Sequence, residues 1–296
     1  MSTMNNTPVE CVLEVQSQLG EGPSWLPRRR QLLWVDIEKS RIHLFDPARR
    51  ENQTFEIGSH VGCAVPGTDG NVFFAGAKGF GHLDLGSGRV SWITHPEAHL
   101  PGNRFNDGKA DPAGRFWAGS LSYAEKEPIG ALYVLDEHRV ARTVVPGVTI
   151  SNGLGWSPDH RTLYYIDTPT MRVDAFDFDP ATSAITNRRT VIRIPEGIGY
   201  PDGLTLDREG MIWIGMWDGW SVTRWDPKSG RQLARIPLPV ARVTACCFGG
   251  ENLDELYLTT ASTRLDAASL AKQPLAGSLF RARPGVQGFA PFEYRG

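Results

Sequence analysis

Short runs of alternating hydrophobic and polar residues, each ending at Asp, Pro or Gly, recur along the whole chain. A typical unit is NGLGWSPDHRTLYYIDT from Asn152: a short apolar strand, a turn, and an aromatic-rich strand that ends in small or polar residues. A third alternating strand follows most units, as in MRVDAFDFDP at 171–180. Alternation with a period of two predicts β-strands, and the turn residues between them predict hairpins. We therefore expect an almost all-β protein with little helix.

The unit occurs six times, and the six copies align on the residue that heads each first strand. We refer to these residues as the heads: Glu21, Gly62, Asn106, Asn152, Asp202 and Thr244. Successive heads are 41, 44, 46, 50 and 42 residues apart, the spacing expected for one four-stranded propeller blade and its loops. The sequence therefore predicts an all-β, six-bladed β-propeller with a metal site in its central channel. We expect one domain over residues 1–296, with residues 1–9 as a flexible tail.

The last unit has little chain left for a fourth strand. The run ECVLEV at 10–15 precedes the first blade and is not otherwise assigned. If this run supplies the missing strand, the ring closes without an exposed sheet edge. We predict that the N-terminal strand completes the last blade.

Composition and charge limit the classes of molecule that the protein is expected to bind. The net charge of -2 provides no basic field for nucleic acid. No apolar run approaches the roughly 20 residues that span a bilayer, and the N-terminus lacks the apolar core of a signal peptide. The four cysteines, far from any C-x-x-C spacing, are expected to be unpaired thiols. We expect a cytoplasmic protein that binds neither nucleic acid nor membrane, as a monomer or weak homodimer.

Equivalent heads of a propeller converge on one mouth of its channel, so residues far apart in sequence become neighbours. Glu21, Asn106, Asn152 and Asp202 would then form an all-oxygen cluster, which suits one divalent cation such as Ca²⁺, Mg²⁺ or Mn²⁺, with Zn²⁺ less favoured. Asn-Gly and Asp-Gly are also common hairpin dipeptides, and one occurs at Asp69-Gly70, away from any head. The shared register of the heads favours the binding site over the simple turns.

Five ordered motifs resemble the gluconolactonase, regucalcin and senescence-marker-protein family of six-bladed propellers. The resemblance covers roughly residues 10–290. Its motifs are LGEGPSW at 19–25, RFNDGKADPAGRFWAG at 104–119, SNGLGWSPD at 151–159, PDGLTLD at 201–207 and TACCFGGENLDELYLT at 244–259.

The resemblance implies residue roles at the matching positions. Family members bind one divalent cation through a Glu, an Asn and an Asp, which implies Glu21, Asn152 and Asp202 as the ligands here. The Arg and Asn of the R-x-N-D-G motif contact the sugar, which implies Arg104 and Asn106, with Asp107 as a turn residue behind the site. Some members add an acidic residue after the AG strand end. In SLSYAEKEP we predict that Glu125 takes this part, with Ser122, Tyr123 and Glu127 as its alternatives.

The resulting hypothesis is a carboxylic-ester hydrolase that opens a sugar lactone to the aldonic acid. Glucono-, galactono-, arabinono- and xylonolactone are all open as substrates. Asp202 is the candidate general base, and a role as metal ligand alone is the alternative. No G-x-S-x-G nucleophile motif is present. Two other functions are considered: a calcium-binding regulatory propeller of the regucalcin type without a major catalytic role, and a protein-interaction scaffold.

Overall fold

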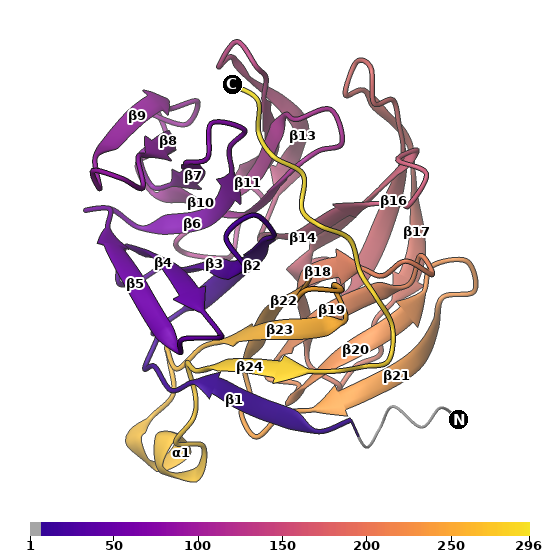
Figure 1. The fold of residues 1–296 in the computed structure, drawn as a ribbon. Helices are drawn as coiled ribbons and strands as arrows, with labels where there is room; N and C mark the ends of the chain where they lie inside the picture. The colour runs from indigo at the N-terminus through magenta and orange to yellow at the C-terminus, as the bar shows by residue number, and fades with distance from the viewer. Residues whose placement is uncertain (1–6) are drawn as a thin grey trace.

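The computed structural model describes residues 7–296. These residues form six four-stranded antiparallel sheets, arranged like the blades of a propeller around a central channel (Figure 1). In each of the first five blades, the strands follow one another from the channel outward in sequence order. The predicted six-bladed β-propeller is therefore confirmed.

The first three blades take up residues 20 to 148. The first blade contains β2 (Gly20–Leu26), β3 (Gln31–Asp36), β4 (Arg41–Asp46) and β5 (Glu51–Glu56). The second contains β6 (Val61–Pro66), β7 (Val72–Gly76), β8 (Gly79–Leu83) and β9 (Val90–Thr94). The third contains β10 (Asn103–Ala110), β11 (Phe116–Ser122), β12 (Gly130–Leu135) and β13 (Ala141–Val148).

The other three blades follow the same plan. The fourth contains β14 (Ser151–Trp156), β15 (Thr162–Asp167), β16 (Arg172–Phe178) and β17 (Ile185–Arg193), with the short 3-10 helix η2 (Thr168–Thr170) after β15. The fifth contains β18 (Tyr200–Leu206), β19 (Ile212–Trp217), β20 (Ser221–Asp226) and β21 (Arg231–Pro237). The sixth contains β22 (Val243–Gly249), β23 (Glu255–Thr260) and β24 (Leu279–Ala282), and α1 (Ala267–Lys272) lies between its last two strands.

The sixth blade is completed by the N-terminal strand β1 (Val9–Leu13). This strand pairs antiparallel with β24, so that Val9 faces Ala282 and Cys11 faces Phe280. The prediction of ring closure is confirmed. The predicted N-terminal tail, residues 1–9, is too long, because Val9 already pairs in the sheet. Residues 1–6 lie outside the described residues.

Large aromatic side chains fill the spaces between the blades. Trp34, Trp117 and Trp213 each come from the second strand of a blade and are fully buried. The Trp117 indole donates to Asp111 and the Trp213 indole donates to Asp207, each over 2.9 Å. Burying an aromatic side chain of this size contributes about 2–3 kcal/mol, so these positions explain why the second strands are rich in aromatic residues.

Each innermost strand breaks its pairing with the second strand at the head position. The register shifts between Glu21 and Ser24 in β2, between Ser151 and Leu154 in β14, and between Pro201 and Leu204 in β18, with matching shifts in β6, β10 and β22. A β-bulge leaves residues unpaired and redirects their side chains. The repeated bulge therefore releases the heads from the regular strand alternation.

The glycines that follow the heads allow neighbouring blades to approach closely. A Cβ on Gly153 would lie 2.7 Å from the Asp202 carbonyl oxygen, and one on Gly203 would lie 2.4 Å from the Ala245 Cβ. The Asn-Gly and Asp-Gly pairs at these heads are thus parts of strands that pack tightly across blades. The alternative reading of these two pairs as hairpin turns is wrong.

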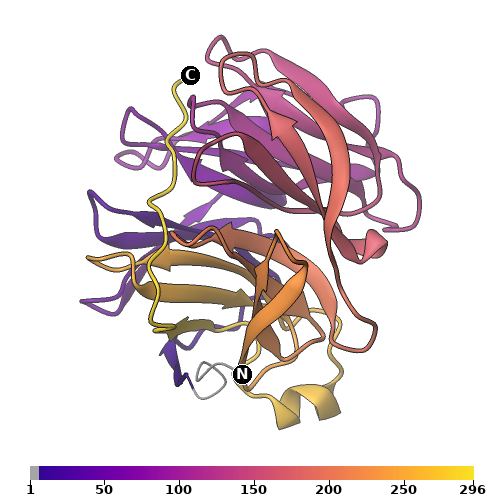
Figure 2. The same cartoon turned by 90° about the vertical axis from the view of Figure 1, so that its right-hand side faces the viewer.

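Three further features complete the fold. The four cysteines are unpaired, as predicted, and three of them are buried. No helix within residues 7–296 is long and apolar enough to cross a membrane. After β24 the chain runs across one face of the propeller as an extended segment (yellow in Figures 1 and 2).

Candidate metal and substrate site at the channel mouth

Four heads meet at one mouth of the channel, as the sequence predicts. Glu21, Asn106, Asn152 and Asp202 come from β2, β10, β14 and β18, and each side chain belongs to a residue that is at most 7% exposed. They form a buried polar cluster whose members are contributed by four different blades. The cluster exists because the same bulge recurs at the start of each inner strand.

The two carboxyl groups of this cluster and the neighbouring Asp107 all have raised pKa values. Burial raises the pKa of Glu21 to about 8, and the charge of Asp107 adds to this effect. Burial also raises the pKa of Asp202 well above its usual range, with the charge of Glu21 as the next cause. The pKa of Asp107 is raised by burial as well. Buried carboxylates that repel one another favour a bound cation, because the cation would relieve both costs.

The donor set suits a hard divalent cation. Oδ1 of Asp202 is buried and has no hydrogen-bond partner among the described residues. Oε2 of Glu21 accepts only one short local bond, from the Gly22 amide at 2.9 Å. Within residues 7–296, no three His, Cys, Asp or Glu side chains gather in a metal-binding arrangement. The candidate set instead combines two carboxylates with the amide of Asn152, an all-oxygen set of the kind that Ca²⁺ and Mg²⁺ prefer.

A chain of hydrogen bonds links the cluster across three blades. Arg104 Nη1 donates to Asn106 Oδ1 at 2.6 Å, and Asn106 Nδ2 donates to Asn152 Oδ1 at 3.0 Å. Asn152 Nδ2 then donates to Thr168 Oγ1 at 2.8 Å, and Thr168 donates to the Pro201 carbonyl at 2.8 Å. These bonds fix the orientation of the Asn152 amide, because its oxygen accepts from Asn106 while its nitrogen donates to Thr168.

Thr168 is a part of this chain that the sequence does not reveal. It lies in η2, after the second strand of the fourth blade and away from every head. A lone Thr before Pro carries no signal for such a role. Only the packing of η2 against β18 brings its hydroxyl between two blades.

Arg104 connects the buried cluster to an outer pocket of about 290 Å³. This pocket is lined by Gln18, Glu38, His60, Arg104, Tyr123, Glu125 and Arg264. The Arg104 guanidinium lies 5.8 Å from the centre of the Tyr123 ring, and the Tyr123 hydroxyl lies 2.9 Å from His60 Nδ1. Within the described chain, Nη2 and Nε of Arg104 make no hydrogen bond, so these groups are left to bind a ligand.

Glu125 lies at the rim of this pocket and outside the buried cluster. Its two carboxylate oxygens accept from Arg264, at 2.6 and 2.8 Å. The pair joins the third blade to the sixth across the mouth. The sequence singled out Glu125, but it contained no sign of Arg264, which lies in the connection between β23 and β24 of the sixth blade.

Asp107 is not in a turn, contrary to the expectation drawn from its Asp-Gly pair. It lies inside β10, in the bulge between Phe105 and Gly108, and its Oδ1 accepts from the Gly108 amide at 2.7 Å. The bulge turns its side chain inward, where it becomes the third buried carboxyl of the cluster.

Fold and site together define a six-bladed β-propeller with a buried polar cluster at one mouth of its channel. The family model described as the SMP-30/Gluconolactonase/LRE-like region matches residues 19–262. The chain belongs to this family, as its motifs indicate.

Relatives match over nearly the full length. Regucalcin from Danio rerio is 39% identical over 297 residues, which cover 99% of this chain and 100% of the relative. Among solved structures, a luciferin-regenerating enzyme is 31% identical with a TM-score of 0.91, over 98% of this chain and 100% of that chain. A calcium-binding protein, regucalcin, from Agrobacterium tumefaciens is 26% identical with a TM-score of 0.93, over 98% of both chains.

Proposed function

We propose that this protein hydrolyses a sugar lactone to its aldonic acid, with one divalent cation held by Glu21, Asn152 and Asp202. The single observation that carries the proposal is the proximity of Arg104, with its unpaired guanidinium donors, to these three side chains: its charge acts on Glu21 and Asp202, and hydrogen bonds through Asn106 link it to Asn152. Membership of a family named in part for gluconolactonase supports the reaction type.

The outer pocket would bind the lactone. Arg104 presents fork-shaped N–H donors from Nη2 and Nε, which match the oxygens of a polyhydroxylated ring and those of the carboxylate product. The polar lining, with Glu38, His60 and Glu125, favours a substrate rich in hydroxyl groups over an apolar ester. Glu125 already forms an ion pair with Arg264. It would therefore accept from the sugar through carboxylate lone pairs that Arg264 does not use.

Asn106 acts mainly on its neighbours. Its amide nitrogen donates to Asn152 and to the Ser151 carbonyl, and its oxygen accepts from Arg104. We propose that it sets the distance between the substrate-binding arginine and the cation ligand. Its predicted contact with a sugar hydroxyl would use the second lone pair of Oδ1.

Asp202 is the proposed general base. Its buried Oδ1 has no hydrogen-bond partner in the described chain, so this atom is available to take a proton from a water molecule that attacks the lactone carbonyl. When bound, the divalent cation would supply Lewis-acid polarisation at this mouth and would favour the ionised form of both carboxyls. Arg104 would hold the ring so that its carbonyl faces the Asp202 side of the mouth.

The alternative is a calcium-binding regulatory propeller, as the names of the regucalcin relatives allow. Arg104 favours the enzyme over this alternative. An ion site alone gains nothing from a buried guanidinium whose charge opposes the cation, whereas a site for lactone and carboxylate oxygens needs such a donor.

The test is an acid-release assay over glucono-, galactono-, arabinono- and xylonolactone, each with Ca²⁺, Mg²⁺, Mn²⁺ or Zn²⁺. We expect turnover of at least one lactone. Arg104→Met should raise KM for that lactone at least tenfold, whereas Arg28→Met, on an exposed turn, should leave KM unchanged. Stoichiometric cation binding without turnover of any lactone would favour the regulatory alternative.

A further inference from the structure

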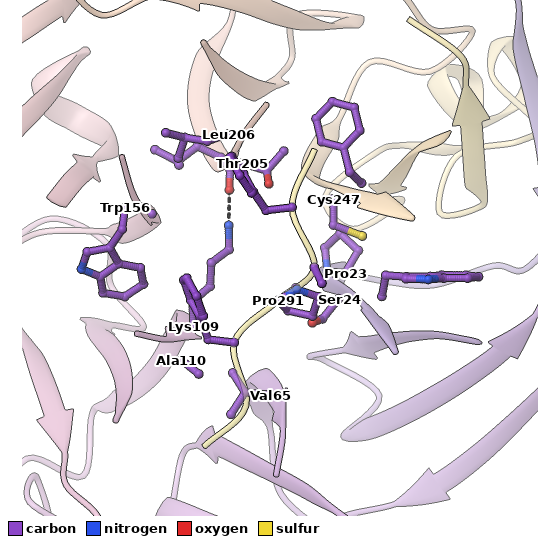
Figure 3. A pocket seen from close by; sticks show the side chains of 18 of the residues that line it. Pro23, Ser24, Val65, Lys109, Ala110, Trp156, Thr205, Leu206, Cys247 and Pro291 are labelled. Carbon is purple, nitrogen blue, oxygen red and sulfur yellow. Dashed lines mark hydrogen bonds between the residues drawn. The ribbon is translucent and has the colours of Figure 1, made fainter. Parts of the chain in front are cut away.

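The opposite end of the channel contains a second cavity, of about 110 Å³. Its wall is formed where the six inner strands end, and it includes Trp25, Trp156 and Phe248. Figure 3 shows Trp156 in this wall. Phe289, Pro291 and Phe292 from the C-terminal segment add to the wall. The cavity is therefore mainly apolar, and none of these side chains belongs to the candidate metal site.

One cation projects into this cavity. Lys109 extends from β10 across the channel, and its ammonium donates to the Leu204 carbonyl of β18 (Figure 3). An ammonium has three donors, and within residues 7–296 this bond is the only one that Lys109 Nζ makes. Cys246 and Cys247 also line the cavity, and burial raises the pKa of both thiols, that of Cys246 to about 12, so both remain neutral.

Lys109 has no ion pair with another described residue, although Asp107 lies close enough for the two charges to attract each other. Asp107 and His160 also line the cavity. The Asp107 charge acts on Glu21 and Asp202, and the charge of Lys109 in turn lowers the pKa of Asp107 against the effect of burial. An ammonium in an apolar space has lost part of its hydration, so it binds a carboxylate more strongly than a surface lysine does.

The C-terminal segment forms a strap over the cavity, which we define as residues 288–294. Its first residue, Gly288, donates to the Leu253 carbonyl, and its last, Tyr294, donates to the Pro66 carbonyl. Between these anchors, the backbone of residues 289–293 makes no hydrogen bond within the described chain. Between its ends the strap is held by side chains alone, including an exposed ion pair between Glu293 and Arg28 at 3.3 Å, so it can move aside without breaking backbone pairing, which provides a route into the cavity.

We propose that this cavity is a second binding site, which takes a compact monocarboxylate with an apolar body. The carboxylate pairs with the Lys109 ammonium, and the body packs against the aromatic wall and the strap. An apolar cavity of about 150 Å³ accommodates benzene, so a cavity of similar order limits the body to one small ring or a short aliphatic chain. The site does not depend on the proposed lactonase activity.

Benzoate is a suitable probe, and benzamide is its neutral control of the same shape. Calorimetric titration of the full-length protein should give a benzoate affinity at least tenfold higher than that for benzamide. Lys109→Met should abolish this preference, Lys109→Arg should preserve it, and Lys78→Met, at an exposed lysine, should not change it. Melting temperatures establish that each variant is folded before it is titrated.

A second arm locates the bound benzoate. Arg104→Met removes the guanidinium at the other mouth, and benzoate should bind this variant as it binds the wild type. The indole N–H resonance of Trp156 should shift on titration with benzoate. Equal affinities for benzoate and benzamide, unchanged benzoate affinity in Lys109→Met, or loss of binding in Arg104→Met would each overturn the proposal.

Discussion

Replacing Glu21 by Gln tests the electrostatics of the candidate metal site. The substitution keeps the size of the side chain and an oxygen that can accept from the Gly22 amide, but it removes the buried charge. In the unfolded chain, the Glu21 carboxyl loses its proton near its usual pKa of 4.5, whereas the folded protein keeps that proton until about pH 8. Unfolding therefore releases a proton between these two pH values, and rising pH lowers the free energy of unfolding.

The size of the effect follows from the pKa shift. Each pH unit inside this window corresponds to about 1.4 kcal/mol, so raising the pH from about 5.5 to about 8 removes about 3 kcal/mol from the stability of the metal-free wild type. For a chain of this length, that loss lowers the melting temperature by about 6 °C. Glu21→Gln has no titrating carboxyl at this position. Its melting temperature should therefore fall by about 6 °C less than that of the wild type over the same change of pH.

The assay is thermal unfolding of chelator-treated protein at both pH values, followed by circular dichroism. Glu137→Gln, at an exposed position, is the control and should follow the wild type. Adding a divalent cation at the higher pH should raise the melting temperature of the wild type much more than that of Glu21→Gln. Parallel losses with pH in the wild type and in Glu21→Gln would refute the account of a strained, buried carboxylate.

Three further predictions concern the scaffold, and each is checked by the melting temperature. Deleting residues 1–13 removes β1 and leaves β24 as an open edge, so the protein should lose stability strongly; an unchanged melting temperature would contradict closure of the ring. Gly119→Ala would place a Cβ 1.7 Å from Ser151 Oγ and should cost several kcal/mol, about the size of a severe overpacking change, whereas Gly102→Ala, with open space around it, should be neutral. Asp207→Asn removes the buried charge that pairs with Arg224 at 2.7 Å and leaves Arg224 only the exposed Glu209 as an ionic partner, so it should cost about 3 kcal/mol; a loss below about 1 kcal/mol would argue against this ion pair.

The sequence predicts the fold because each blade repeats the same local pattern. The six heads could be aligned from the repeated pattern of strand, turn and aromatic strand, and the N-terminal strand could be assigned because one strand was missing from the count. The bulges at the heads could not be predicted, since Asn-Gly and Asp-Gly in sequence look the same in a bulge and in a turn. Asp107 shows this, because its inward orientation depends on where β10 breaks register with β11.

The repeat pattern could not predict the contacts between blades. Thr168 and Arg264 lie in connecting segments, whose position depends on packing between units rather than on alternation within one unit. Lys109 follows the R-x-N-D-G motif, but its extension across the channel to β18 becomes visible only in three dimensions (Figure 3). The sequence therefore identified residues within repeats, whereas residues that connect repeats required the structure.

The central claim is that the cluster of Glu21, Asn152 and Asp202 supports lactone hydrolysis with a bound cation. The most direct measurement is the rate of acid release from the best lactone substrate by chelator-treated protein, before and after the cation is restored. We predict turnover only when the cation is present, with loss of at least a hundredfold in Asp202→Asn although this variant remains folded. Equal rates in chelated and cation-loaded wild type, or wild-type turnover by Asp202→Asn, would contradict the claim.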